Sequence, residues 1–224
     1  MSWLAIALWG GAVGLDATAF AQVMVSRPLV AAPVMGLLLG RPLEGVAVGV
    51  LLELFALVIL PIGAARYPEA GTAAVAATAG YIAASGGEQR PDMLLLAVVF
   101  ALLWERVCGA SVNALRRFNE RLVASVDGRD PLEPRRLERV HLTAVALDFG
   151  RGALVTVVGA ALVTAVLAAA SAGPGIGDDV AVGMLCVAGA AMAGAALSLF
   201  DGWSGRRFAV VLGAICGLIL LIVG

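Results

Sequence analysis

The sequence predicts an all-α, polytopic membrane protein. Apolar residues make up 61% of the 224 residues, charged residues make up only 14%, and the mean hydropathy is +0.99. A soluble domain of this length does not need so much apolar surface. Several stretches also approach the ~20 mostly apolar residues that a membrane-spanning helix requires.

The first predicted element covers residues 3–25, which are apolar and rich in Gly and Ala but contain Asp16 and Gln22. Asp16 either caps a helix or pairs inside the bundle. Asp16 and Gln22 are six residues apart and point to different faces of a straight helix, so they need not act together.

The second element lies between Pro28 and Gly40 and is too short to span a bilayer as a helix. Pro28 and Pro33 also remove donors from the helical hydrogen-bond ladder. These features predict a broken or re-entrant element, which is tolerated at membrane depth where it is buried in protein or lines a cavity. Arg27, just before it, is either a surface charge or the structural anchor of this element together with Pro28.

The third element covers residues 44–60 and carries Glu53 near its middle. A carboxylate in the middle of a spanning helix is costly, so Glu53 is expected to face a polar cavity or a partner. Glu69 follows, just before an Ala-rich helix that runs to about residue 84. Glu69 is either a first-turn acid favoured by the helix dipole or a second carboxylate at the same cavity.

The second half of the sequence predicts a helix over residues 93–115, a pair of amphipathic helices on either side of Pro131, and apolar segments at about 150–171, 180–199 and 207–223. Nine of the fifteen Arg residues lie between Arg106 and Arg151. The positive-inside rule therefore places residues 116–140 in the cytoplasm. Acidic residues are interspersed there, which argues against nucleic acid as a partner.

Three domains follow from this pattern. Residues 1–92 form an N-terminal membrane half, residues 93–149 a helix leading into a cytoplasmic hairpin, and residues 150–224 the C-terminal membrane helices. Small residues spaced four apart predict close helix packing or, alternatively, a sliding surface. These pairs are Gly10 and Gly14, Gly36 and Gly40, and Gly45 and Gly49.

The sequence contains no P-loop, no zinc-protease motif and no nucleophile elbow. No catalytic residue, cofactor or metal site is therefore predicted. The only histidine, His141, lies beside Val140 and Leu142 and has no catalytic partner in view, so a structural role is favoured over phosphorylation or proton relay.

The stretch from Gly14 to Ala84 resembles the IIC subunit of the mannose/fructose/sorbose family of sugar phosphotransferase systems. The order and spacing of the motifs carry the resemblance. They are Leu15-Asp16, Gln22, Met24, Ser26-Arg27-Pro28-Leu29-Val30, Gly36-Leu37-Leu38-Leu39-Gly40, Gly45, Gly49, Leu52-Glu53-Leu54, Pro61-Ile62-Gly63-Ala64-Ala65 and Pro68-Glu69-Ala70.

This resemblance implies a permease subunit of the bacterial inner membrane, with a core domain of re-entrant hairpins that shifts against a scaffold domain. Such a subunit binds a sugar and moves it inward by alternating access. Glu53 and Glu69 would lie at the sugar site, and Gln22, which can donate and accept hydrogen bonds, is a further candidate.

The implied partners are a IID membrane subunit, in a trimer of IIC–IID pairs, and soluble IIA and IIB phosphocarriers. Because those carriers hold the phosphorylated histidines, His141 is not expected to carry phosphate. Pro61 stands where the mannose branch has Asn, and Glu69 where an Asp is frequent. The alternative, prompted by Pro61 and by an early carboxyl terminus, is a membrane scaffold or regulatory remnant that does not transport.

Overall fold

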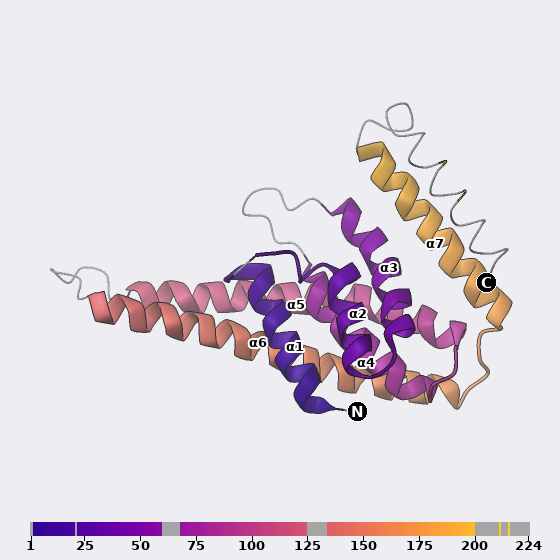
Figure 1. Ribbon diagram of the computed structural model, residues 1–224, viewed down its shortest axis with the longest axis horizontal. Helices are drawn as coiled ribbons and strands as arrows, with labels where there is room; N and C mark the ends of the chain where they lie inside the picture. The colour runs from indigo at the N-terminus through magenta and orange to yellow at the C-terminus, as the bar shows by residue number, and fades with distance from the viewer. Residues whose placement is uncertain are drawn as a thin grey trace.

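The computed structural model describes residues 2–20, 22–59, 68–124 and 134–199, together with residues 211 and 215. These residues form helices joined by short linkers, and no strand occurs among them (Figure 1). The all-α class expected from the sequence is confirmed. Among the described residues, three helices are long and apolar enough to cross a membrane: α5 (Pro91–Ala124), α6 (Pro134–Ser171) and α7 (Asp178–Leu199).

Helix α1 (Trp3–Thr18) lies obliquely across α6 (Pro134–Ser171), as Figure 1 shows. The contact depends on small residues. A Cβ added to Gly10 would lie 2.4 Å from Thr156, and one added to Gly14 would lie 2.9 Å from the Cα of Gly152. Gly10 and Gly14 therefore act in close helix packing, the first of the two roles open from the sequence.

The predicted element over residues 3–25 ends earlier than expected. Helix α1 stops at Thr18, and a linker continues to Arg27. The carboxylate of Asp16 accepts the backbone N–H groups of Val23 (2.7 Å) and Ser26 (2.9 Å), which turns the chain back on itself. Asp16 is thus a buried acceptor that shapes the linker, a tertiary effect that hydropathy does not show.

Helices α2 (Pro28–Leu38) and α3 (Pro42–Val58) form a tight hairpin. Pro33 lies inside α2 and does not end it, contrary to the expected break. A proline in a helix is tolerated where a neighbouring helix packs against it, and here Pro33 packs against glycines of α3. A Cβ on Gly45 would lie 2.5 Å from the backbone oxygen of Ala32, so only glycine permits this approach. The hairpin turns at Gly40, whose φ is +73°.

Helix α4 (Ala70–Ser85) occupies the centre of the molecule and packs against α6, α5 and α2. Most of its residues are buried, on all sides of the helix. A helix that is apolar all round belongs in such a central position. Its small Ala, Gly and Thr side chains let the neighbouring helices approach closely, as in membrane bundles.

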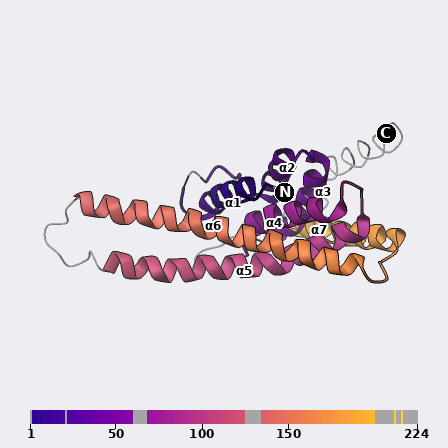
Figure 2. The ribbon, with the colours of Figure 1, turned by 90° about the horizontal axis from the view of Figure 1, so that it is seen from below.

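Helix α5 (Pro91–Ala124) and α6 run side by side as a long hairpin (Figure 2). With 34 and 38 residues, they extend about 50 Å and 57 Å at ~1.5 Å per residue, which exceeds the ~30 Å hydrocarbon core. The expected amphipathic helices are therefore continuations of the membrane helices. No helix-breaking proline occurs between residues 92 and 124 or between 135 and 171.

The expected boundary between residues 149 and 150 falls inside the continuous helix α6. The breaker near Pro131 lies outside the described residues. Helix α7 (Asp178–Leu199) follows and packs on α3 and α5. The last predicted segment, 207–223, lies outside the described residues apart from Val211 and Ile215. The division into a moving core and a scaffold stays a prediction.

Candidate functional site

Arg27 and Glu53 hold the beginning of helix α2 against α3. The Arg27 Nε donates to Glu53 Oε1 at 2.9 Å, and its Nη2 contacts the same oxygen. Glu53 Oε2 accepts the backbone N–H of Leu29 at 3.1 Å. The carboxylate therefore caps one of the free amides at the beginning of α2. Pro28, which has no N–H, also suits the first position of a helix.

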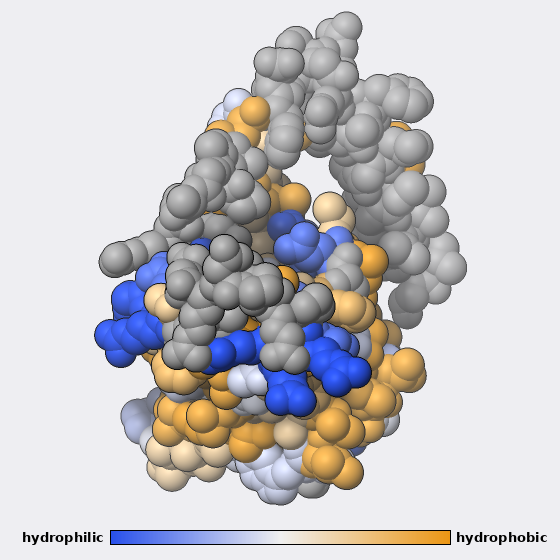
Figure 3. Space-filling view, turned by 90° about the vertical axis from the view of Figure 1, so that its left-hand side faces the viewer, coloured by the Kyte–Doolittle hydropathy of each residue, from blue (hydrophilic) through white to orange (hydrophobic). Residues whose placement is uncertain are grey.

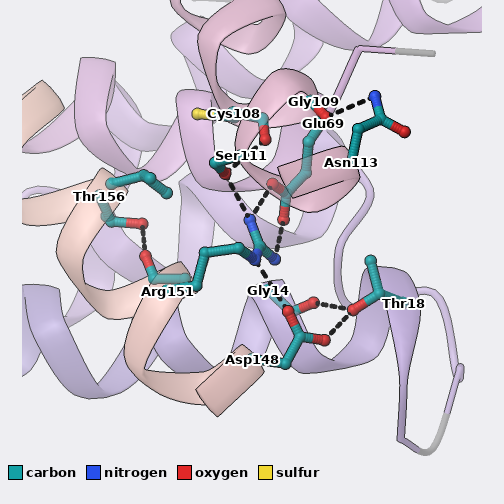
Figure 4. A network of polar contacts seen from close by, with 12 residues as sticks. Gly14, Thr18, Glu69, Cys108, Gly109, Ser111, Asn113, Asp148, Arg151 and Thr156 are labelled. Carbon is teal, nitrogen blue, oxygen red and sulfur yellow. Dashed lines mark hydrogen bonds and ion pairs between the residues drawn. The ribbon is translucent and has the colours of Figure 1, made fainter. Parts of the chain in front are cut away.

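A second ion pair lies deeper in the molecule and joins Glu69 to Arg151 of α6 (Figure 4). Arg151 Nη1 donates to Glu69 Oε2 at 2.6 Å, and Nη2 donates to Glu69 Oε1 at 3.1 Å. The guanidinium thus binds both carboxylate oxygens, which is the strong and directional form of this interaction. Glu69 precedes the first residue of α4, so the pair fixes that end of α4 to α6.

Arg151 also connects to the neighbouring helices. Its Nε donates to Asp148 Oδ1 at 2.8 Å, and its Nη1 donates to the hydroxyl of Ser111 at 3.2 Å. The other Asp148 oxygen contacts the hydroxyl of Thr18. Figure 4 shows Ser111 of α5, Asp148 of α6 and Glu69, just before α4, around the guanidinium, while Thr18 of α1 contacts Asp148. Each buried charge therefore has a partner, as burial of charge requires.

A cavity of about 230 Å³ opens beside these two ion pairs. The linker before α2, the end of α3, the beginning of α4 and the middle of α5 surround it. Ala56, Ile59 and Val112 supply apolar walls. The polar and charged lining residues are Thr18, Ser26, Arg27, Glu69, Asn113 and Arg116.

The cavity wall offers both hydrogen-bond donors and acceptors. The hydroxyls of Thr18 and Ser26 can do both, and the carboxylate of Glu69 accepts. Ala70 and Gly71, in the first turn of α4, also line the cavity, and the side chain of Glu69 does not cap this helix. The first amides of a helix have no partner within the helix. Such a wall suits a small, neutral, polyhydroxylated ligand.

The structure separates the residues predicted at the site. Glu69, Arg27 and Pro28 line the cavity, whereas Glu53 is absent from its lining and reaches it only through Arg27. Gln22 is exposed in the linker with a φ of 51° and does not line the cavity. His141 is exposed on α6. The motif at 61–65 lies outside the described residues, between Ile59 and Pro68, which both line the cavity.

Sequence reasoning did not single out Arg151, Asp148 or Arg116. The only signal for the first two was a pair of opposite charges three residues apart at the start of an apolar segment, which is a common arrangement on a helix. Arg116 looked like one of many arginines in a polar stretch. Only the packing of α5 and α6 shows that these charges lie beside Glu69 and its cavity.

Comparison with known proteins places the chain in a family. The model of the sorbose-specific IIC component of the phosphotransferase system matches residues 1–203. A sorbose-specific EIIC component from Lacticaseibacillus casei is 34% identical over 96 residues, which cover 43% of this chain and 34% of that protein. The match thus spans about a third of the relative's length.

Two solved structures have a similar fold. One, described as a membrane protein, has a TM-score of 0.68 at 21% identity and covers 98% of this chain and 93% of its own. The other is a cryo-EM structure of the mannose transporter ManYZ with microcin E492. It has a TM-score of 0.58 at 20% identity and covers 98% of this chain and 91% of its own. The chain is a membrane protein that belongs to the family of sorbose-specific IIC components of the phosphotransferase system.

Proposed function

We propose that this chain is the sugar-binding and translocating IIC component of a phosphoenolpyruvate-dependent phosphotransferase system. It imports a hexose-type sugar by alternating access, together with a IID subunit, while soluble IIA and IIB proteins deliver phosphate. The observation that carries the proposal is the cavity beside Glu69, whose wall combines hydroxyls, a carboxylate and helix amides. The similar fold of the mannose transporter ManYZ supports the same substrate class.

In this proposal the sugar contacts Glu69 directly. Arg151 already binds both Glu69 oxygens, but each carboxylate oxygen accepts more than one hydrogen bond. The guanidinium therefore orients the carboxylate and leaves it able to accept from sugar hydroxyls. Glu53 acts one step further away, since it holds Arg27 and the beginning of α2 at the cavity wall.

The size and walls of the cavity fit this role. Its volume of about 230 Å³ lies below the ~300–1,000 Å³ of sites for drug-sized ligands, as expected for a monosaccharide. Helices α2 and α4 both begin at the cavity wall. The free amides at a helix beginning can donate hydrogen bonds to a ligand that reaches them.

The test is hexose binding and uptake by Glu69→Gln. Hydrogen bonds to a charged group contribute about 1.5–3 kcal/mol, so hexose affinity should fall about tenfold or more. Binding is measured with radiolabelled hexoses on the purified chain with IID, and uptake in cells that also supply IIA and IIB. The variant should still insert, because Arg151 keeps Asp148 as a partner.

Glu105→Gln is the matched control. Glu105 is a buried carboxylate of α5, with 4% of its surface exposed, and it does not line the cavity. Its replacement should change hexose affinity by no more than about twofold. This is well below the tenfold change, ~1.4 kcal/mol, expected for Glu69→Gln. Normal hexose binding by Glu69→Gln would contradict the placement of the site. A wild-type complex that binds no hexose would contradict transport and favour a scaffold role.

A further inference from the structure

One face of helix α5 runs the length of the cavity wall. Gly109, Val112, Asn113 and Arg116 line it, and this spacing places them on the same side of a helix. From Gly109 to Arg116 the face extends about 10 Å at ~1.5 Å per residue. The cavity therefore has an inner end beside Gly109 and an outer end at Arg116.

Arg116 belongs to two hollows of the surface. It lines the cavity, and it also lines an open groove formed by the last turns of α5, with Asn119, Glu120 and Val123. Arg116 therefore lies at the point where the cavity opens toward the tip of the α5–α6 hairpin. Figure 3 views the molecule from that side and shows hydrophilic side chains gathered there above an apolar lower surface.

The charge on Arg116 differs from the other charges of the cavity wall. Arg27 is paired with Glu53, and Glu69 is paired with Arg151. Within the described ranges, no carboxylate lies within ion-pair distance of Arg116, whose side chain is exposed. Glu120 lines the same groove one turn further along α5 but lies beyond ion-pair distance of Arg116. The outer end of the cavity thus carries a cation that is not paired with a described carboxylate.

A neutral sugar gains little from such an unpaired cation, whereas a phosphorylated sugar gains a great deal. A phosphate monoester carries about −1.5 to −2 charges at pH 7. The planar guanidinium of arginine binds two phosphate oxygens at once. Resting on the function proposed above, we propose that Arg116 forms a phosphate subsite at the outer end of the cavity, which binds the phosphoryl group of the sugar phosphate before its release.

This subsite makes the affinity of the site depend on the chemical state of the sugar. The unmodified hexose occupies the inner cavity beside Glu69, where neutral donors and acceptors bind its hydroxyls. After phosphorylation, the phosphoryl group lies at Arg116, at the mouth of the cavity. Arg116 makes and breaks no covalent bond; it binds and orients the product at the exit.

The test compares Arg116→Gln with Arg117→Gln in the purified complex of the chain with IID. Arg117 is the next residue of α5. It is exposed and lines neither the cavity nor the groove. Mannose 6-phosphate, fructose 1-phosphate and inorganic phosphate compete at pH 7.5 with a radiolabelled neutral hexose. Arg116→Gln should raise the inhibition constants of both sugar phosphates about tenfold or more, since a charge-assisted hydrogen bond is lost.

Arg117→Gln should leave binding of the neutral hexose within about twofold, and Arg116→Gln should weaken it much less than binding of the sugar phosphates. Binding of the neutral hexose also shows that both variants are folded. Equal inhibition constants for Arg116→Gln and the wild type would overturn the subsite. Equal losses in Arg116→Gln and Arg117→Gln would also overturn it, because they would indicate only general attraction of anions. A wild-type complex that binds hexose but no sugar phosphate refutes the subsite alone. Absence of hexose binding refutes the proposed function.

Discussion

Two ion pairs border the same cavity, but they differ in burial. The side chains of Arg27 and Glu53 are 37% and 13% exposed, whereas those of Arg151 and Glu69 are 8% and 5% exposed. The first pair lies at the beginning of a short helix and leaves Arg27 partly accessible. The second pair lies inside the molecule and connects to Asp148 and Ser111.

This difference in burial assigns different roles to the pairs. A partly exposed pair contributes less to stability than a buried one. Removal of one partner of a buried pair is strongly destabilising, because the other charge is left buried without a counter-charge. We therefore expect loss of Arg151 to lower the free energy of unfolding most. Loss of the Arg27–Glu53 pair should change mainly the geometry of the cavity.

The largest effect is expected for Arg151→Met. This change leaves Glu69 and Asp148 buried without their cation, which should lower the free energy of unfolding by about 3–5 kcal/mol. Denaturation of the purified chain in mild detergent measures the change. Arg41→Met is the matched control, because Arg41 is 42% exposed and pairs with Glu44 at 3.3 Å, so its loss should cost about 1 kcal/mol. Equal losses in the two variants would remove the distinction between buried and exposed pairs.

A smaller effect is expected for Glu53→Gln. The amide oxygen can still accept from Leu29, but the charge that holds Arg27 is lost. We expect a stability loss of about 1–2 kcal/mol, between the values for an exposed pair and a buried one. Sugar uptake should fall while the chain still inserts and assembles, because Arg27 lines the cavity.

The effect of Glu53→Gln on hexose affinity should be smaller than that of Glu69→Gln, since Glu53 does not line the cavity. Binding assays on both variants, carried out in parallel, make this comparison. A stronger loss in Glu53→Gln would show that the sugar contacts Glu53 itself. Unchanged uptake in Glu53→Gln would remove Glu53 from the site.

The smallest effect is expected for Gln22→Asn. Gln22 is exposed, and its φ of 51° lies in the left-handed region that Asn tolerates well. Stability should change by less than about 0.5 kcal/mol, as for other surface substitutions, and hexose affinity should stay within twofold. A clear loss of affinity would extend the site from the cavity to the linker between α1 and α2.

The all-α membrane class could be predicted from composition, because a run of about 20 apolar residues is typical of a membrane-spanning helix. The boundaries of the elements were harder. The ends of α1 and α2 depend on Asp16 and on glycine packing with α3, and these contacts join segments that hydropathy treats separately. The lengths of α5 and α6 were underestimated because the sequence changes from apolar to amphipathic within each helix. That change resembles a helix end, although the helical backbone hydrogen bonds continue through it.

At the candidate site, the sequence by itself determined that Glu53 needs a polar partner, because an isolated charge is too costly in an apolar helix. It also placed Glu69 at the beginning of a helix. Only the tertiary structure decided which cations pair with these acids, since Arg151 lies 82 residues from Glu69. It also decided that Glu69 and Arg116 share a cavity that Glu53 and Gln22 do not line. Such pairings depend on how helices distant in sequence cross, and no local pattern of residues specifies that.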